Sequence, residues 1–471
     1  MAMGKRKSEE QQAFWIPTGD LPQATAHPFY EALNKLLAKH RFDSFAEKQC
    51  RKFYADKMGR PSLPPAVYFR MMLIGYLEGI DSERGIAWRV ADSLALRRFL
   101  GYGLTDPTAD HSTLSRNRRL IDLETHQEVF TWVLRLLAQE GLLKGKTLGI
   151  DATTLEANAA LRSIVRRDTG ESYQEFLTRL AQASGIETPT RQDLARLDRD
   201  RPHKGSNEDW RNPYEPDAKI AKMKDGRTHL AHKAEHAIDM QSGAIMAVTL
   251  QPADRGDTTS IGETFQQAHD NLLEVVADEK ACAQLSEAVL TEVVADKGYH
   301  SNEVLKEQRE CGVRTYISEP DRGRRRWVDK PEEKAAVYGN RRRIRGEHGK
   351  RLMKRRGELV ERSFAHCYDT GGMRRTHLRE HPNILKRLLI HAAGLNLGLV
   401  LRSLCGLGTA RGFQGLAGRL FELILRLWLA ARRLFAPIGS HPLWVWTPRP
   451  VESHPTTTVL ALRTGRSTTG C

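Results

Sequence analysis

Two kinds of hydrophobic spacing divide the chain, one typical of helices and one typical of strands. From His27 to about Leu143, apolar residues recur every three or four positions, as in Met71, Ile74 and Leu77. This spacing places the apolar side chains on one face of a helix. The pattern therefore predicts an all-helical N-terminal domain over about residues 20–143.

Within this region the order is helix, turn and helix, with a basic second helix. Ser82 precedes one helix, Gly101-Tyr102-Gly103 suits a turn, and Asp110 begins another helix. The second helix can dock on DNA through phosphate contacts, or its arginines can simply face water. Its cationic residues are Arg116, Arg118 and Arg119.

The spacing changes near residue 146, where short β-branched and apolar runs predict strands. The first run carries Asp151 near its end, and a later one leads directly into Asp296. In chain order the predicted strands are 146–155, 230–238, 244–250, 289–295 and 313–318, and the predicted helices are 258–278, 302–311 and 357–368. This order predicts a mixed α/β domain, an antiparallel hairpin on a partly parallel sheet with flanking helices.

Two insertions interrupt this predicted domain of residues 144–400. The first covers about 156–228, and its part from 196 to 216 is rich in charge, Pro, Asn and Gly, so we expect an exposed, partly mobile segment. The second covers about 319–356 and is basic. Residues 401–471 form a tail, in which 416–435 reads as an amphipathic helix that packs on the core or on a second protomer.

Composition narrows the class of protein. The chain has 73 Lys and Arg against 58 Asp and Glu, a formal charge of +15, which makes nucleic acid the first candidate partner. The six cysteines lack the spacing of a zinc site or disulfide framework. The most apolar run, 388–401, is shorter than the roughly 20 residues that cross a bilayer. We expect a soluble intracellular protein with no membrane association.

Three acids are candidates for metal-dependent chemistry on phosphodiesters. Asp151 and Asp296 each end a predicted strand, and Glu361 lies on a predicted helix that can pack across strand ends. Carboxylates suit the hard cations that clamp attacking and leaving oxygens in two-ion sites. Taken singly each signal is weak, because an Asp after a strand often forms a turn or caps a helix.

The segments around these acids resemble the three acidic blocks of bacterial insertion-sequence transposases of the Asp-Asp-Glu (DDE) type. They are 149–158, 295–301 and 360–366, and the third continues through 371–379. The basic helical segment 59–119 also resembles the domain that precedes the catalytic core in that family, so the resemblance covers roughly residues 20–400. It implies an RNase H-like fold, two Mg²⁺ or Mn²⁺ ions per active site, and Asp151, Asp296 and Glu361 as catalytic metal ligands.

The third block departs from the family pattern in two places. Gly357 stands where related enzymes often carry Arg, and Tyr368 where they often carry Lys. We expect a neighbouring arginine to take over the phosphate contacts. Glu358 is the alternative third acid, although the sequence context favours Glu361. Candidate phosphate ligands in this block are Arg356, Arg362, Arg374 and Arg375.

A basic stretch from Arg322 to Arg356 carries fifteen Lys or Arg against four acids, and it also contains Trp327. Cationic surfaces with aromatics suit distorted DNA ends, where an indole can stack on an unpaired base; alternatively Trp327 packs in the core. In the second block Tyr299 could touch the scissile strand or cap the sheet. The remaining candidate DNA contacts of these two segments are Lys297, His300, Arg324, Arg325, Arg326, Arg341, Arg342 and Arg343.

The leading hypothesis is a transposase that cuts the terminal inverted repeats of its element and joins the freed 3′-hydroxyl to target DNA, acting as a homodimer on DNA. A catalytically silent DNA-binding remnant of such an element, or an RNase H-like nuclease without strand transfer, are the alternatives. The three intact acids disfavour the remnant. A helical docking domain and a long basic insertion disfavour the plain nuclease.

Overall fold

The computed structural model describes residues 27–55, 62–201, 205–223, 226–321, 323, 325–406 and 408–410. All of these lie in the first of two compact units, which ends at Gln414. The predicted tail helix at 416–435 lies outside the described residues.

Helices fill the described chain before the first strand, as the three- and four-residue spacing predicts. Several begin where a side chain accepts a hydrogen bond from a free backbone N–H of the first turn: Ser82 accepts from Gly85, Asp110 from Thr113 and Asp122 from Thr125. The helices are α1 (Pro28–Lys39), α2 (Phe42–Cys50), η2 (Arg51–Phe53), α3 (Pro65–Glu78), α4 (Glu83–Asp92), α5 (Leu94–Leu100), α6 (His111–Leu120) and α7 (Leu123–Gln139).

A mixed sheet follows, with strand order β4-β5-β1-β7-β8 and β6 on the same edge of β5 as β4. Strands β5 and β6 form the predicted antiparallel hairpin, while β7 and β8 run parallel to β1. This arrangement is consistent with an RNase H-like domain. The strands are β1 (Thr147–Glu156), β4 (Lys219–Lys222), β5 (Thr228–Asp239), β6 (Ile245–Pro252), β7 (Glu292–Ala295) and β8 (Arg314–Ile317).

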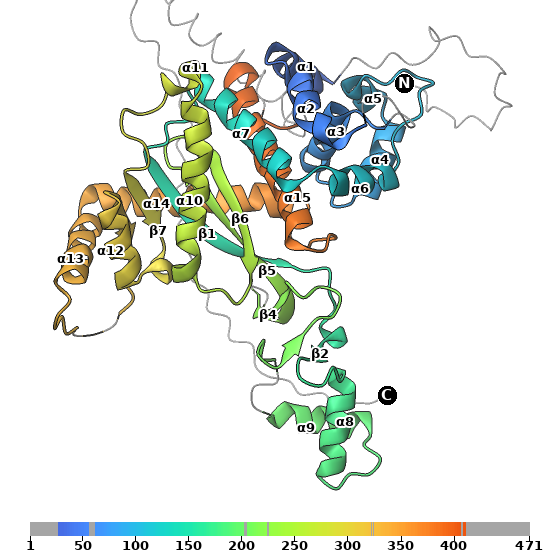
Figure 1. Ribbon diagram of the computed structural model, residues 1–471, viewed down its shortest axis with the longest axis vertical. Coiled ribbons are helices and arrows are strands. Elements are labelled where there is room, and N and C mark those ends of the chain that lie inside the picture. The colour runs from blue at the N-terminus through green and yellow to red at the C-terminus, as the bar shows by residue number, and fades with distance from the viewer. Residues whose placement is uncertain are drawn as a thin grey trace, which may run out of the picture. The chain divides into compact units, whose positions relative to one another are not determined.

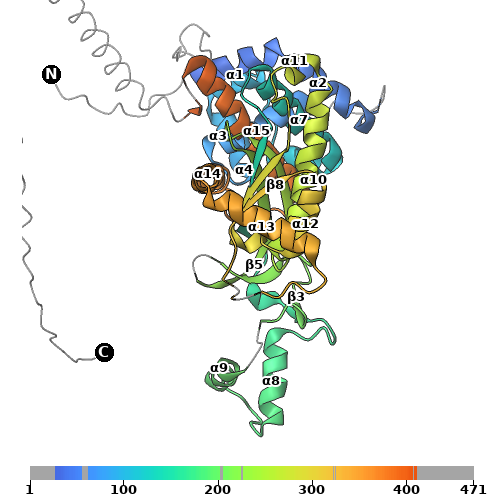
Figure 2. The same ribbon diagram turned by 90° about the vertical axis from the view of Figure 1, so that its left-hand side faces the viewer.

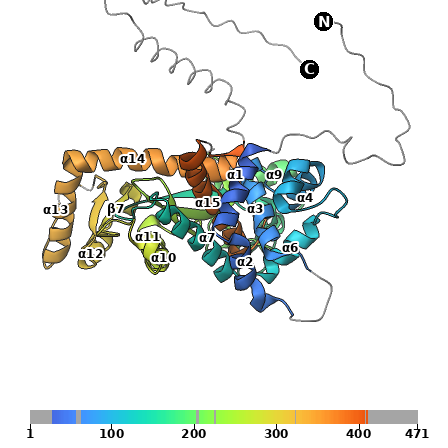
Figure 3. The same ribbon diagram turned by 90° about the horizontal axis from the view of Figure 1, so that it is seen from above.

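Helices cover both faces of the sheet (Figure 1). On one face α10 (Asp257–Val276) packs against β5 and β6, followed by α11 (Glu279–Cys282). On the other, α14 (Glu347–Phe364) crosses β1 and β7, and the view from above shows the strands between α14 and α10 (Figure 3). The remaining helices here are η4 (Lys297–Tyr299), α12 (Asn302–Glu310), α13 (Pro331–Arg345) and the π-helix η5 (Ala365–Thr370).

The long helix α15 (His381–Cys405) joins the helical region to the sheet. It packs against α7, α3 and β6, and its Asn396 exchanges hydrogen bonds with the backbone of Ile245 in β6. Its length and composition would suit a membrane span, but 67% of its most apolar window is buried inside the protein. A continuous hydrophobic core runs from Phe29 in α1 to Ala410, across the predicted domain boundary between α7 and β1.

The first predicted insertion folds into an arm of its own beyond β4 (Figure 2). It contains η3 (Leu161–Ser163), β2 (Val165–Arg166), α8 (Tyr173–Ala183), α9 (Arg191–Asp200) and β3 (Trp210–Arg211). A separate small core holds it together, built by Ala157, Ile164, Trp210, Ala218 and Leu230. Trp210 is buried within the stretch expected to be exposed, because the rings of Tyr173 and Phe176 in α8 pack against it.

The second predicted insertion, the basic stretch 319–356, is largely helical. It forms α13 and the first part of α14, so the helix expected to begin at Gly357 begins ten residues earlier, at Glu347. The charges hide its periodicity, since only a few apolar residues such as Val337 and Leu352 mark the inward face.

Candidate active site

Two of the predicted acids lie level with each other on adjacent parallel strands. Asp296 directly follows β7, but Asp151 is the fifth residue of β1, which continues to Glu156 instead of ending at Asp151 as predicted. The strands pair with Thr147 opposite Glu292 and Gly149 opposite Val294. Continued by two residues, this register brings Asp151 opposite Asp296. The parallel pairing of β1 with β7 therefore brings these two acids together where β7 ends.

The carboxylate of Asp151 is partly buried and lies near both a second acid, Asp296, and the guanidinium of Arg356. Its side chain is 24% exposed, and burial raises the pKa of this carboxyl, as does the negative charge of Asp296, while Arg356 opposes the shift. The Nη1 of Arg356 donates to Oδ2 of Asp151 at 2.6 Å, and the backbone N–H of Ala152 donates to Oδ1 at 2.9 Å. The pair of acids therefore favours a positive charge nearby, which the guanidinium supplies here.

The third predicted acid, Glu361, reaches the same region on α14 but does not join the other two. Arg356 and Val360 mark the inward face of this helix, and Glu361 projects from its flank with an exposed side chain. No group of three or more His, Cys, Asp or Glu side chains in the described part of the chain is close enough to hold a metal ion. The structure thus pairs two acids and places the third on the helix that crosses them.

The alternative third acid, Glu358, points away from the sheet. It lies about half a turn around α14 from Arg356, at 100° per residue, and forms an ion pair of 2.7 Å with Arg362 on the exposed side. By the same count Glu361 lies about 140° from Arg356, so both glutamates are on the exposed side of α14, and Glu358 is the one engaged in an ion pair.

Buried polar contacts hold α14 and the residues after it against the sheet. His236 of β5 lies opposite Asp151 in the register, and its ring bonds Ser363 Oγ at 2.9 Å and the hydroxyl of Tyr368 at 2.5 Å. Burial lowers the pKa of His236 to about 3, so the ring is neutral. The guanidinium of Arg374 lies 5.8 Å from the ring centre of Tyr368 and donates to Thr153 Oγ1 at 3.2 Å. An arginine therefore stands beside the position where related enzymes often carry Lys.

The predicted DNA contacts separate into exposed and occupied side chains. Lys297, Arg116, Arg119, Arg326, Arg342 and Arg375 are exposed; Arg362 is half exposed, and Arg356 and Arg374 are partly buried. Arg324 lies outside the described residues.

Several predicted contacts cannot reach DNA in this conformation, because their side chains are buried or engaged inside the protein. Arg118 is 8% exposed and paired with Glu83 at 2.7 Å, and Tyr299 and His300 are fully buried. The engaged residues of the basic stretch are Arg325 and Arg341, which pair with Glu319, and Arg343, which donates to Thr315. Trp327 packs against the hydrophobic core beside Tyr338, as the simpler interpretation expects.

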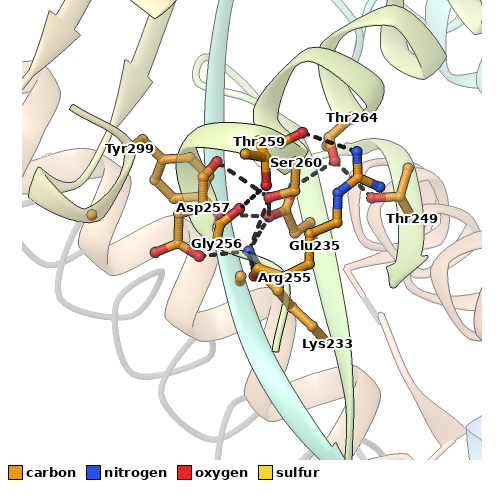
Figure 4. Close-up of polar contacts among 12 residues, drawn as sticks. Lys233, Glu235, Thr249, Arg255, Gly256, Asp257, Thr259, Ser260, Thr264 and Tyr299 are labelled. Carbon is orange, nitrogen blue, oxygen red and sulfur yellow. Dashed lines mark hydrogen bonds and ion pairs between the residues drawn. The ribbon is translucent and has the colours of Figure 1, made fainter. Parts of the chain in front are cut away.

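Sequence reasoning missed a polar cluster on the α10 face, formed by the buried Lys233 and Glu235 and the partly exposed Asp257 with hydroxyl-bearing neighbours (Figure 4). The available signal was the Lys and the Glu at alternate positions of the predicted strand 230–238. Side chains two apart in a strand share a face, and two opposite charges on a covered face imply a network.

Comparison with known protein families gives two matches. A model described as a transposase domain matches residues 20–120, and one described as a transposase DDE domain matches residues 183–397. The second match includes Asp296 and Glu361 but begins after Asp151. Neither a curated protein nor a solved structure matches the chain.

Proposed function

Since the chain belongs to the DDE transposases of insertion sequences, enzymes that cleave DNA and transfer the cut strand, we propose that Asp151, Asp296 and Glu361 form its catalytic centre. The observation that carries this assignment is the register between β1 and β7, which sets Asp151 level with Asp296. Asp151 lies outside the matched catalytic-domain segment, so its assignment rests on this geometry and on the sequence context.

Enzymes of this family use divalent metal ions, and the donor set suits them. Two carboxylates at one sheet edge, one with its pKa raised by burial, are the hard oxygen ligands that Mg²⁺ or Mn²⁺ prefers. We propose that Asp151 and Asp296 hold two such ions, with Glu361 completing the set after a rotation of its exposed side chain. The ions, when bound, supply a polarised water or 3′-hydroxyl for attack and stabilise the leaving oxygen.

The chain's own groups then have distinct roles. The Ala152 N–H orients the Asp151 carboxylate. Arg356 donates to Asp151 and would be placed to contact a non-bridging phosphate oxygen if Asp151 held a cation. Arg374, next to Thr153 on β1, is a second candidate for the DNA backbone.

DNA docking uses two exposed basic surfaces. On α6, Arg116 and Arg119 face outward, which supports the predicted role of the N-terminal helices as a DNA-binding region. The second surface is the outer side of α13 and α14, with Arg342, Arg345, Lys350, Arg351 and Lys354. We further propose that the enzyme acts as a homodimer, one protomer for each terminal inverted repeat, on DNA in the bacterial cytoplasm.

The test compares neighbouring acids on a plasmid that carries the gene with its flanking DNA. Asp296→Asn and Glu361→Gln should abolish Mg²⁺-dependent cleavage but retain DNA binding in a gel-shift assay, because an amide oxygen is a poor substitute for a carboxylate on Mg²⁺. Glu358→Gln is the matched control three residues from Glu361, and it should cleave like the unaltered protein.

Robust cleavage by Asp296→Asn would overturn the assignment. Loss of cleavage in Glu358→Gln with retention in Glu361→Gln would exchange the roles of the two glutamates. The same reactions, analysed for joined products, separate a transposase from a nuclease, since a nuclease yields cut DNA and no strand transfer.

A further inference from the structure

A charged network is buried under the sheet on the α10 face. Lys233 is 6% exposed at its side chain and Glu235 is fully buried. The Nζ of Lys233 lies 2.6 Å from Oδ1 of Asp257 and 3.0 Å from Oε1 of Glu235, and it donates to Ser260 Oγ at 2.9 Å (Figure 4). It also donates to the backbone carbonyl of Arg255 at 3.2 Å, so this lysine has four polar partners.

The carboxylate of Glu235 is equally well satisfied. Its Oε2 accepts from Thr264 Oγ1 at 2.6 Å, and its Oε1 accepts from Ser260 Oγ and, at 3.2 Å, from the hydroxyl of Tyr299. Moving a carboxylate and an ammonium out of water is costly, and well-packed apolar residues often give equal or greater stability. Stability alone therefore does not account for this network.

One partner of Glu235 belongs to the turn that carries Asp296. Asp296 begins the short helix η4, where its Oδ1 accepts from the N–H of Gly298 at 2.8 Å. Tyr299 is the last residue of that turn and its side chain is completely buried. The hydrogen bond from the Tyr299 hydroxyl to Glu235 fixes the turn against the sheet. Burial raises the pKa of the phenol, so Tyr299 keeps the proton that it donates.

Asp257, the ion-pair partner of Lys233, flanks the same turn. A Cβ on Gly298 would lie 2.4 Å from Oδ2 of Asp257 and 3.0 Å from Oδ1 of Asp296. The two carboxylate oxygens are therefore no farther apart than the sum of these distances. Lys233 holds the other oxygen of Asp257, so the same buried pair of charges fixes Asp257 beside the turn and bonds Tyr299 at its end.

We propose that Glu235, through Tyr299 and through Lys233 with Asp257, is a positioning residue that fixes the orientation of the Asp296 carboxylate for metal binding. This inference rests on the proposed role of Asp296 as a metal ligand. Groups that orient a ligand from behind typically change metal affinity by 10- to 100-fold when they are removed.

The experiment measures binding of Mn²⁺ alone to the full chain, from the loss of the electron paramagnetic resonance signal of free Mn²⁺. Tyr299→Phe should weaken Mn²⁺ binding about tenfold, because the turn loses its bond to Glu235. Glu235→Gln, which preserves shape, should weaken it at least as much. Thermal unfolding without metal reports the purely structural effect of each change.

Tyr316→Phe is the matched control. Its hydroxyl also donates to a buried glutamate of the sheet, Glu292, at 3.3 Å, but away from the Asp296 turn. It should lower thermal stability about as much as Tyr299→Phe and leave Mn²⁺ binding unchanged. Equal effects of the two tyrosine variants on Mn²⁺ binding would overturn the positioning role.

Asp296→Asn separates this inference from the proposed function. Reduced Mn²⁺ binding in Asp296→Asn with unaltered binding in Tyr299→Phe and Glu235→Gln would leave Asp296 a ligand and refute only the positioning role. Mn²⁺ binding that Asp296→Asn does not change would refute the ligand assignment itself.

Discussion

Replacing Gly298 by alanine tests how tightly the geometry of the Asp296 turn controls cleavage. The added Cβ would lie 3.0 Å from Oδ1 of Asp296 and 2.4 Å from Oδ2 of Asp257, whereas ordinary contacts begin at 3.4 Å. Asp296 must therefore shift by about 0.4 Å and Asp257 by about 1 Å. Gly298 has no left-handed φ, so its backbone accepts alanine without strain.

These displacements predict an enzyme that folds well and works poorly. A misplacement of 1 Å at reacting groups can cost about 100-fold in rate, so the smaller shift of Asp296 should lower cleavage about tenfold, or about 1.4 kcal/mol in activation free energy. Stability should change by less than about 1 kcal/mol, because alanine also restricts the unfolded chain. The assay is single-turnover plasmid cleavage at saturating Mg²⁺, beside urea unfolding.

Gly262→Ala is the control, since it adds the same methyl group to α10, the helix that begins at Asp257. A Cβ there meets no atom within 4 Å, so this variant should gain up to about 1 kcal/mol in stability and cleave normally. Cleavage by Gly298→Ala at the unaltered rate would refute the reasoning, because Asp296 would then tolerate a displacement that the proposed site forbids.

Three further predictions concern regions away from this turn. Arg116→Ala and Arg119→Ala should each reduce the slope of log DNA affinity against log salt by about 0.9 in a binding titration. Arg118→Ala leaves Glu83 without its ion-pair partner and should instead lower the free energy of unfolding in urea by about 3 kcal/mol. Equal salt slopes in all three variants would contradict this division between DNA-binding and structural arginines. Trp210→Ala should lower the local stability of the arm by about 3–5 kcal/mol, because Trp210 fills the arm's own core. We expect rapid proteolysis between α8 and β3 while the sheet resists the protease. Uniform proteolysis of the chain would show that the arm core is not separate. Burial lowers the pKa of His126 to about 3, so the stability that its neutral ring contributes is complete above pH 6.5. Below that pH the unfolded chain takes up a proton that the folded protein does not, and about 2 kcal/mol of stability is lost at pH 5. In urea unfolding, His126→Gln should show a smaller difference in unfolding free energy between pH 7.5 and pH 5, and an unchanged difference would count against the buried neutral ring.

The positions of Asp151 and Asp296 could be predicted because an acid that follows a short apolar, β-branched run is a local sequence pattern. A short β-branched run followed by an acid correctly marks Asp296 at the end of β7, and it finds Asp151 although β1 continues for five more residues; the parallel pairing of the two strands makes these acids neighbours. The side chain of Glu361 was less accessible to this reasoning, since its orientation depends on how α14 crosses the sheet and on the π-helix at Ala365–Thr370. That wider turn follows Glu361 and delivers Tyr368 to His236.

Pairing between distant residues explains what the sequence could not show. Arg118 has the same local setting as Arg116 and Arg119, but it meets Glu83 on α4 and is buried. Likewise, an independent N-terminal domain is a natural prediction from helical spacing, whereas the contacts of α3 and α7 with α15 depend on residues about 240 to 340 positions later. Deleting the N-terminal helices would uncover α15, so point substitutions on α6 are the better test of DNA docking.

The arm between β1 and β5 has a consequence for how such enzymes can diversify. Glu156 and Ala231 are paired at its base, and the next residues inward, Ala157 and Leu230, share a backbone hydrogen bond of 2.8 Å and belong to the arm's own core. The arm thus occupies the place of a simple hairpin turn and closes on itself. Exchanging its 74 residues for a four-residue turn would remove only about 2–3 kcal/mol of loop-closure entropy. Lineages could therefore gain, lose or swap this module, together with the edge strand β4 that it contains, at a single hairpin while inheriting the strands that position Asp151 and Asp296.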